Sequence, residues 1–369
     1  MFRKLLMVGF VFLFILSACA EEPDQGTTSV PTTADEGTSA EETPAGARQL
    51  RVMTHDSFAI SEEVAQEFEE THNVELQILQ SGDTGTALNR AILSKNNPLA
   101  DVFYGVDNTY LTRSLDEGIF EPYQSPQLAN IPEQYRLDSQ NRALPVDWGD
   151  VCLNYDKIYF EEIGIEPPQT LEDLLEPEYE SLLVVENPAS SSPGLAFLLA
   201  TIGVFGEDGY LEYWEGLVEN DVLVVQDWNT AYYTEFSGSS GRGPRPIVVS
   251  YGSSPAAEVI FADPPIEEPP TASVTADNTC FRQIEFVGIL SGTPNRDLAE
   301  LWVDFMLSTT FQEDMPMQMF VFPVLEDAEL DDAFQQYMEI PENPVQVDVE
   351  TISENREEWL QAWTETVLQ

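Results

Sequence analysis

The sequence predicts an α/β protein whose sheets are mainly parallel, and three observations lead to that class. Short apolar stretches typical of strands alternate with stretches of helical spacing along most of the chain. The length of 369 residues is enough for two domains. The content of 43% hydrophobic and 11% aromatic residues is ample for packed cores, so global disorder is excluded.

The first part of the folded body alternates strands and helices. Strands are expected at 49–53, 74–79 and 101–104, and helices at 61–71 and 84–94. The helix at 61–71 is the clearest of these, because Val64, Ala65 and Phe68 fall at helical spacing on one face. This order predicts a parallel sheet that helices cover on both faces.

The second part continues the pattern. Strands are expected at 151–155, 182–185, 247–250 and 280–290, and helices at 194–204, 210–219 and 297–307. In sheets of this kind, ligands gather where strand ends meet helix starts. The segments that follow the strands are therefore the place to look for a site.

The N-terminus has the pattern of an export signal. Arg3 and Lys4 precede an apolar run at 5–15 that is too short to span a membrane. The run closes in Leu-Ser-Ala-Cys, which resembles the bacterial lipobox, so residues 1–18 are expected to be a signal peptide and Cys19 a lipidated N-terminus. The residues from Cys19 to 49 are mostly small, acidic or proline, and predict a disordered tether. The folded body would then be held at the outer face of the cytoplasmic membrane.

The net charge of −51 excludes some partners. Asp and Glu number 66 against 15 Lys and Arg, and no basic cluster occurs. Nucleic acid is excluded, since its phosphates are bound by clustered Lys and Arg, and so is electrostatic docking on an anionic membrane. Because the acidic residues are spread along the chain, we expect a solvated acidic surface. An anionic cleft that attracts a cation is the alternative.

Two cysteines remain in the body, in strand-like runs. Cys152 and Cys280 would lie in an oxidising compartment, where pairing is permitted. A disulfide, two buried free thiols and a nucleophilic cysteine all remain open on the residues alone.

Five polar segments follow strands or precede helices, at 54–58, 105–108, 187–194, 227–233 and 250–255. Each has a structural alternative: Asp56 and Asp107 could cap helices, and Trp228 could belong to the core. Ser191 and Ser192 precede a helix, whose free N–H groups could hold an anion or a polar group. The occurrence of all five at such positions favours a binding site.

Seven motifs in order resemble the thiamine-binding proteins of ABC importers. They are V-x-T-x-D-S-F, A-D-V-x-x-G-x-D-N, N-Y-D-K, P-x-x-S-S-P-G-L, W-x-x-A-Y, S-Y-x-x-S-P-A and F-P-V, at 52–58, 100–108, 154–157, 188–195, 228–232, 250–256 and 322–324. The resemblance covers the body from about residue 50 to the end.

The resemblance implies a two-lobe periplasmic-binding fold with two crossover strands at the hinge. One lobe would span 50–150 together with part of 285–369, and the other 151–284. Crossover strands at 151–155 and 280–287 would bring Cys152 and Cys280 together, which favours a disulfide. Closure of the lobes on ligand would be the signal that the permease detects.

The implied ligand is thiamine or a thiamine phosphate, bound by a monomer. Its cationic ring suits the faces of Trp228, Tyr232 and Tyr251, and Asp107 would accept from the pyrimidine amine or balance the cation. Ser191, Ser192 and Gly194 suit the hydroxyl or phosphate end. Segment 319–322 carries Phe where the family tends to have Trp and Tyr. The full expected set is Asp56, Asp107, Asn108, Ser191, Ser192, Gly194, Trp228, Tyr232, Tyr251, Ser254 and Phe320.

Three alternatives remain on the same fold. A ferric-ion binder could use Tyr232, Tyr233 and His55 as ligands. A binder of polyamines or other organic cations is the second alternative. A thiaminase-like enzyme would need a free Cys152 in the cleft. The expectation is a binding protein and not an enzyme, with no cofactor and no metal, whose partners are an ABC permease and, through its lipid, a membrane.

Overall fold

The computed structural model describes residues 46–239 and 242–368, so the predicted signal peptide, Cys19 and most of the tether lie outside the described residues. The strands are β1 (Arg48–Thr54), β2 (Val74–Gln80), β3 (Val102–Asp107), β4 (Phe120–Glu121), β5 (Leu144–Asp156), β6 (Leu183–Glu186), β7 (Leu223–Val225), β8 (Ile247–Tyr251), β9 (Thr271–Val274), β10 (Phe281–Leu290) and β11 (Phe322–Pro323).

Twelve α-helices are present in the described residues. They are α1 (Glu62–His72), α2 (Thr84–Leu93), α3 (Leu111–Asp116), α4 (Lys157–Ile163), α5 (Ser192–Phe205), α6 (Tyr210–Glu219), α7 (Trp228–Thr230), α8 (Ser254–Ile260), α9 (Arg296–Met306), α10 (Thr309–Met319), α11 (Asp332–Tyr337) and α12 (Val349–Val367). Shorter helical turns lie at Pro126–Asn130, Glu133–Tyr135, Glu172–Leu175, Pro177–Tyr179 and Ala231–Glu235.

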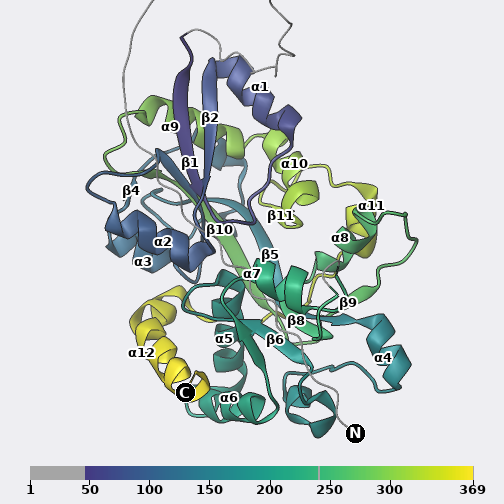
Figure 1. Ribbon diagram of the computed structural model, residues 1–369. Helices are drawn as coiled ribbons and strands as arrows, with labels where there is room; N and C mark the ends of the chain where they lie inside the picture. Colours follow the sequence, from purple (N-terminus) through teal and green to yellow (C-terminus); the bar gives the residue numbers. More distant parts are fainter. Residues whose placement is uncertain (1–45, 240–241, 369) are drawn as a thin grey trace, which may run out of the picture. The chain divides into compact units, whose positions relative to one another are not determined.

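One mixed sheet connects these elements, in the order β2-β1-β3-β10-β5-β8-β6-β7 (Figure 1). β1 is parallel to β2 and β3, and β6 is parallel to β7 and β8. We call β2, β1 and β3 the first half of the sheet and β8, β6 and β7 the second half. Between them run β10 and β5, antiparallel to each other and to their outer neighbours. Two largely parallel groups joined by two long crossing strands are what the sequence predicted.

The crossing strand β5 is much longer than the predicted strand at 151–155. It begins at Leu144, because Asp147 and Gly149 pair with Glu285 and Gln283 of β10 despite their polar or small side chains. These residues interrupt the apolar pattern, so periodicity alone begins the strand seven residues too late. Cys152 of β5 is joined to Cys280, the residue before β10, by a disulfide that fastens the crossing strands together.

The strand β3 continues past the predicted end at Tyr104. Gly105 has a φ of +104°, a conformation that side chains rarely adopt, and the strand pairs onward until Asp107 lies opposite Glu285. From the sequence, residues 105–108 were expected to follow the strand. The structure shows that the glycine lies inside the strand and that its end is two residues further on.

Side-chain caps fix where the helices around the sheet edge begin. Asp83 accepts the backbone N–H of Thr84 at 2.7 Å at the start of α2. Ser191 caps α5, and Pro193 in the first turn of that helix has no N–H to leave unpaired. A cap of this kind is worth about 1 kcal/mol, because it satisfies a donor that the helix start leaves free.

Large aromatic side chains fill the core on both sides of the sheet. Phe68 of α1 packs edge-on against Trp302 of α9 with ring centroids 4.8 Å apart. In another cluster Trp214 of α6 meets Trp363 of α12 at 5.4 Å. These clusters cover the two halves of the sheet and leave the strand ends between them free for a site.

The C-terminal helix α12 was absent from the sequence prediction. Its buried residues Ile352, Arg356, Trp359 and Trp363 have helical spacing, but polar residues surround them and weaken the pattern. α12 contacts α6 and α3, which adjoin different halves of the sheet. Among the described residues no single helix is long and apolar enough to span a membrane. Of the described helices, only α5 and α6 taken together meet the length and hydropathy criteria, and the two helices are bent by 119° relative to each other.

Candidate functional site

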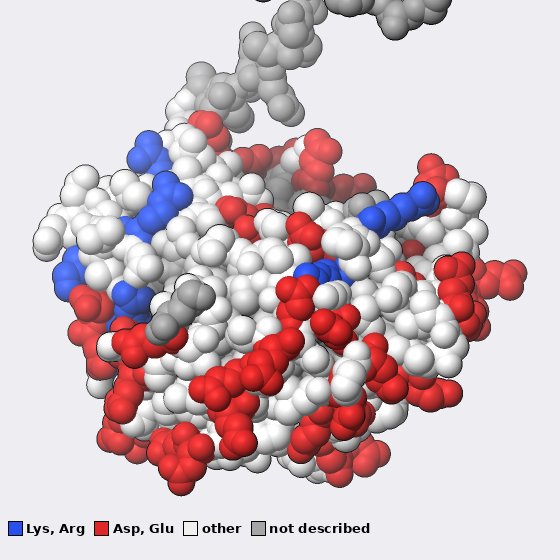
Figure 2. Space-filling model, turned by 60° about the horizontal axis from the view of Figure 1, so that its bottom comes forward, with Lys and Arg blue, Asp and Glu red and all other residues white. Residues whose placement is uncertain are grey.

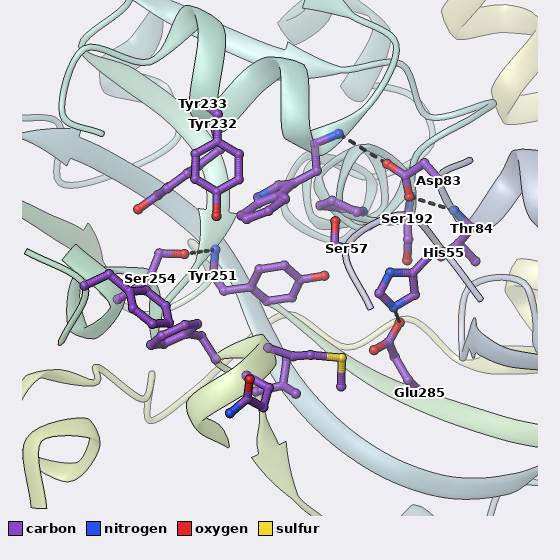
Figure 3. A pocket seen from close by; sticks show the side chains of 18 residues that line it. His55, Ser57, Asp83, Thr84, Ser192, Tyr232, Tyr233, Tyr251, Ser254 and Glu285 are labelled. Atoms are coloured by element: carbon purple, nitrogen blue, oxygen red, sulfur yellow. Dashed lines mark hydrogen bonds and ion pairs between the residues drawn. The ribbon is translucent and has the colours of Figure 1, made fainter. Parts of the chain in front are cut away.

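A cavity lies at the strand ends, between the two halves of the sheet (Figure 3). It encloses about 840 Å³ of empty space, open solvent at its mouth included. His55, Asp83 and Glu285 lie at one end, and Trp228 and the neighbouring tyrosines at the other. The remaining lining residues are Ser57, Thr84, Ser192, Pro193, Tyr232, Tyr233, Tyr251, Ser254, Ala257, Phe261, Gln318, Met319, Phe320 and Val321.

Asp83 joins three elements at the polar end of the cavity. Besides capping α2 at Thr84 (Figure 3), its carboxylate accepts the backbone N–H of Ser192 at 3.4 Å and that of Trp228 at 3.3 Å. Burial raises the pKa of Asp83, while hydrogen bonds from Ser191 and Thr84 oppose that shift. The carboxylate therefore ties the first half of the sheet to the starts of α5 and α7.

Glu285 supplies a second carboxylate from the crossing strand β10. The Tyr104 hydroxyl lies 2.7 Å from Asp147 and 2.9 Å from Glu285, behind the cavity wall. The pKa of Asp147 is raised well above its usual range, first by burial and then by the charge of Glu285. Burial acts in the same direction on Glu285, yet its pKa is lowered, because His55 and hydrogen bonds from Asp147 and Tyr104 favour the charged form. Asp147 holds the proton of this pair, and Glu285 presents the negative charge.

Aromatic rings form the opposite end. Trp228 stacks on Tyr232 with centroids 5.0 Å apart and planes 16° apart, and Tyr233 meets its edge at 5.4 Å. The indole N–H donates to Ser250 at 3.0 Å, which fixes the ring that faces the cavity. Tyr251 stands at a steep angle to Trp228, at 6.5 Å and 65°. Such faces attract a cation by about 0.5–2 kcal/mol each.

Phe320 enters the mouth from an unusual backbone conformation. Its φ of +56° is in the left-handed region, which is rare for a bulky residue and is found at functional sites. The Ser253 hydroxyl donates to the Phe320 carbonyl and holds it there. Phe261, 66% exposed, meets Phe320 edge-on at 5.3 Å, so the mouth is apolar.

Six residues of the predicted set line this cavity: Ser192, Trp228, Tyr232, Tyr251, Ser254 and Phe320. Three others support it from outside. Asp56 accepts the N–H of Gly82 at 2.8 Å, Ser191 caps α5, and Gly194 lies so close to Glu186 that a Cβ would be 2.6 Å from its carbonyl oxygen. Their contacts are with the protein itself.

Asp107 and Asn108 also lie behind the cavity wall. Asp107 is fully buried and accepts from the N–H and hydroxyl of Thr109, both at 2.6 Å, and from the Gln283 amide at 2.9 Å. Burial raises its pKa to about 7. Asn108 bonds the backbone of β10 at Arg282 and Ile284. The direct ligand contact expected of Asp107 is therefore not what this geometry offers.

Gln283 links Asp107 to two residues of the cavity lining by hydrogen bonds. Its amide nitrogen donates to Asp107 and, at 2.7 Å, to the Ser192 hydroxyl, while its oxygen accepts from the Tyr251 hydroxyl at 3.0 Å. Two lining side chains are thus oriented through one amide. Asp107 acts as a positioning residue.

The predicted binding set omitted both acids and the histidine of the lining. Asp83 follows β2 and starts α2, so the strand-exit pattern used elsewhere would have found it. Glu285 is an acid between the apolar residues Ile284 and Phe286 of a buried strand, and a buried acid of this kind is a candidate for function. His55 was considered only as an iron ligand.

The structure bears on the two alternatives that need a free cysteine or a metal site. Cys152 is in the disulfide with Cys280, so neither is a thiol. Tyr232 donates to Glu258 at 2.9 Å and lies at the end of the cavity opposite His55 (Figure 3). Within residues 46–239 and 242–368, no three His, Cys, Asp or Glu side chains are grouped to hold a metal ion.

The chain is similar to known proteins of one family. Residues 97–343 match the family described as bacterial extracellular solute-binding protein. The chain is 27% identical over 323 residues to the thiamine-binding periplasmic protein of Escherichia coli strain K12, covering 86% of this chain and 93% of that one.

Solved structures share the fold. A periplasmic thiamin binding protein matches with a TM-score of 0.75 at 26% identity, covering 87% of this chain and 96% of its own. A ferric binding protein from Campylobacter jejuni matches with a TM-score of 0.69 at 19% identity, covering 86% and 99%. At that identity the second likeness concerns the fold alone.

Proposed function

The chain belongs to the bacterial extracellular solute-binding proteins, which are transport proteins and not enzymes, and from this premise we propose that it captures thiamine or a thiamine phosphate. The ligand would occupy the cavity between Glu285 and Trp228 and be delivered to an ABC permease. The observation that carries the proposal is the pairing of an aromatic end with a carboxylate end in one cavity.

The chemistry of thiamine matches those two ends. Its thiazolium carries a permanent positive charge, and its aminopyrimidine is flat and donates hydrogen bonds. Trp228 and Tyr251 offer ring faces, and Asp83 and Glu285 offer carboxylates that balance a cation or accept from an amine. None of the described lining residues is Lys or Arg. Ser192 and Thr84 lie at helix starts and suit the hydroxyethyl arm or its phosphate.

The similar proteins support the same ligand class. Both the Escherichia coli relative and the solved structure at 26% identity are named for thiamine binding. Their likeness extends over more than four fifths of this chain, so the strands and helices that line the cavity are included.

Ferric iron is the ligand of other proteins with this fold, but no feature of this cavity favours it. The Tyr232 hydroxyl donates a hydrogen bond to Glu258, and the Tyr232 ring stacks on Trp228. His55 pairs with Glu285 at the other end. An organic cation such as a polyamine would find the carboxylates and an aromatic face for an ammonium group, but it has no flat ring that could stack on Trp228.

Delivery of the ligand to a permease requires that the two lobes can close and that the protein is held near the membrane. We propose that residues 50–150, with part of 285–369, form one lobe and residues 151–284 the other, hinged on β5 and β10. Lipid at Cys19 and the acidic tether would hold a monomeric body at the outer face of the cytoplasmic membrane, where closure around ligand is presented to the permease.

Native mass spectrometry of the purified body tests the ligand class. Protein incubated with equimolar thiamine, thiamine monophosphate, spermidine and ferric citrate should retain one thiamine or thiamine phosphate. Retention of spermidine or iron alone would contradict the proposal. A variant with Trp228→Ala serves as a control, because it should lose the thiamine adduct while keeping its folded charge-state distribution.

A further inference from the structure

His55 occupies a fixed place at the polar end of the cavity. Its ring lies over Gly105, where a Cβ would be 2.4 Å from the imidazole Cδ2, so only glycine admits it. Tyr104 supports the ring at 5.6 Å and 44°. In this position Nε2 is 3.6 Å from a Glu285 oxygen, with side chains that are 13% and 12% exposed. The imidazole and the carboxylate are thus a nearly buried pair that faces the cavity (Figure 3).

The charged groups that act on His55 are all acidic: Glu285 on β10, Asp83 at the start of α2 and Asp56 after β1. The Tyr104 ring packs beside it. Around Glu285 lie three further titratable groups, Asp107 on β3, Asp147 on β5 and Tyr251 on β8. Among the described residues that line the cavity, His55 alone is basic. It is therefore the one side chain there that competes with a cationic ligand for Glu285.

We propose that His55 is the resident counter-cation of Glu285 and that a cationic ligand replaces it in this role, with release of the imidazolium proton to solvent. The inference rests on the proposed function, because it requires a cationic ligand. His55 is then a specificity-determining residue, since a neutral ligand of the same shape would leave the pair intact.

Electrostatics gives the direction of the pH dependence. Burial disfavours the charged imidazole, but the charge of Glu285, aided by Asp83 and Asp56, raises the pKa of His55 above its usual value. A bound cation adds positive charge beside the ring and lowers that pKa. Ligand affinity should therefore fall about tenfold per pH unit below the pKa of free His55, and become level above it.

Calorimetry at several pH values tests the exchange. Thiamine is titrated into the protein between pH 6 and 8.5 in buffers of different ionisation enthalpy, which gives the number of protons released per ligand. Wild type should approach one released proton per thiamine at pH 6 and release fewer as the pH rises. His55→Gln should release few protons at any pH and lose most of the pH dependence, so that its affinity changes less than threefold between pH 6 and pH 8.5.

The chain contains only two histidines, so a matched control exists. His72 lies at the end of α1 against Phe68, and His72→Gln should behave as wild type. Asp83 and Asp107 also have raised pKa values and could release protons, but both remain in His55→Gln, so the variant separates their contribution.

The outcomes separate the two proposals. No heat with thiamine at pH 8.5 overturns the proposed function and this inference with it. Binding of thiamine without proton release in wild type, or with equal release in His55→Gln, overturns the inference and leaves the proposed function standing.

Discussion

Asp83 accepts the backbone N–H of Trp228 at 3.3 Å, so a carboxylate beside the first half of the sheet holds the aromatic end of the cavity beside the second half. Nearby, Gly85 donates to the Ser190 carbonyl at 3.0 Å, and the Tyr110 hydroxyl donates to Pro188, also at 3.0 Å. The two halves are thus in direct contact along one side of the cavity.

Replacing Asp83 should weaken both folding and binding. Asp83→Ala leaves the N–H groups of Thr84, Ser192 and Trp228 without their acceptor, and should lower the free energy of unfolding by about 1–3 kcal/mol. Thiamine affinity should fall at least tenfold, because Trp228 is no longer held. Denaturant unfolding and calorimetry measure the two effects.

A matched control for Asp83 is a helix cap outside the cavity lining. Asp331 caps α11 by accepting the N–H of Ala333 at 2.8 Å. Asp331→Ala should lower the free energy of unfolding by about 1 kcal/mol and leave thiamine affinity unchanged. Equal loss of affinity in both variants would contradict a specific role for Asp83.

Trp228 should report ligand through its fluorescence. A thiazolium stacked on the indole should quench emission to saturation, and Trp228→Ala should weaken binding by about 1–3 kcal/mol. Trp228→Phe keeps a ring face but loses the bond to Ser250, so it should fall between wild type and alanine. Unchanged affinity in Trp228→Ala would exclude the indole from the site.

The disulfide should stabilise the body measurably. Cys152 and Cys280 are 128 residues apart, and a link across a long loop restricts the unfolded chain, typically by about 2–4 kcal/mol. A Cys152→Ser, Cys280→Ser double variant should lose that much unfolding free energy. Thiol titration of the unfolded, non-reduced body should find neither Cys152 nor Cys280 reactive, and two reactive thiols at these positions would contradict the pairing.

Asp107 should make stability depend on pH. Burial raises its pKa to about 7, so the folded protein holds a proton that the unfolded chain releases near pH 4. Its contribution to stability is full below about pH 4 and is lost as pH rises through about 7. Denaturation at pH 5 and pH 8 should show a smaller difference between the two values in Asp107→Asn than in wild type. An equal or larger difference in the variant would contradict this.

Anchoring can be tested on whole cells. Cys19→Ser removes the residue that the lipobox pattern marks for lipidation, so the protein should move from the membrane fraction to the soluble extracytoplasmic fraction. An unchanged membrane fraction would remove the lipoprotein proposal without affecting the binding site.

The sequence predicted the aromatic end of the cavity better than the polar end. Trp228, Tyr232 and Tyr251 belong to motifs with a recognisable order, and large aromatic residues beside strand ends are conspicuous. Asp107 was assigned to the ligand because it follows a strand, but its carboxylate accepts from the amide of Gln283, which lies 176 residues further along the chain. Such long-range contacts leave no local pattern.

From the sequence, the acidic residues were expected to form a solvated surface. Figure 2 shows Asp and Glu spread over the face it presents, with few Lys and Arg among them. The carboxylates of the cavity differ from these surface acids, because Asp83 and Glu285 are held in place by hydrogen bonds inside the fold. Composition gives the surface charge, whereas only the fold selects which acids face the ligand.

The most direct test of this account is a calorimetric titration of the mature body with thiamine at pH 8.5, beside parallel titrations with spermidine and ferric citrate. The account predicts one thiamine per protein, bound at least 100-fold more tightly than either competitor (about 2.7 kcal/mol), with affinity reduced in Glu285→Gln. Absence of thiamine binding, or tighter binding of spermidine or iron, would contradict it.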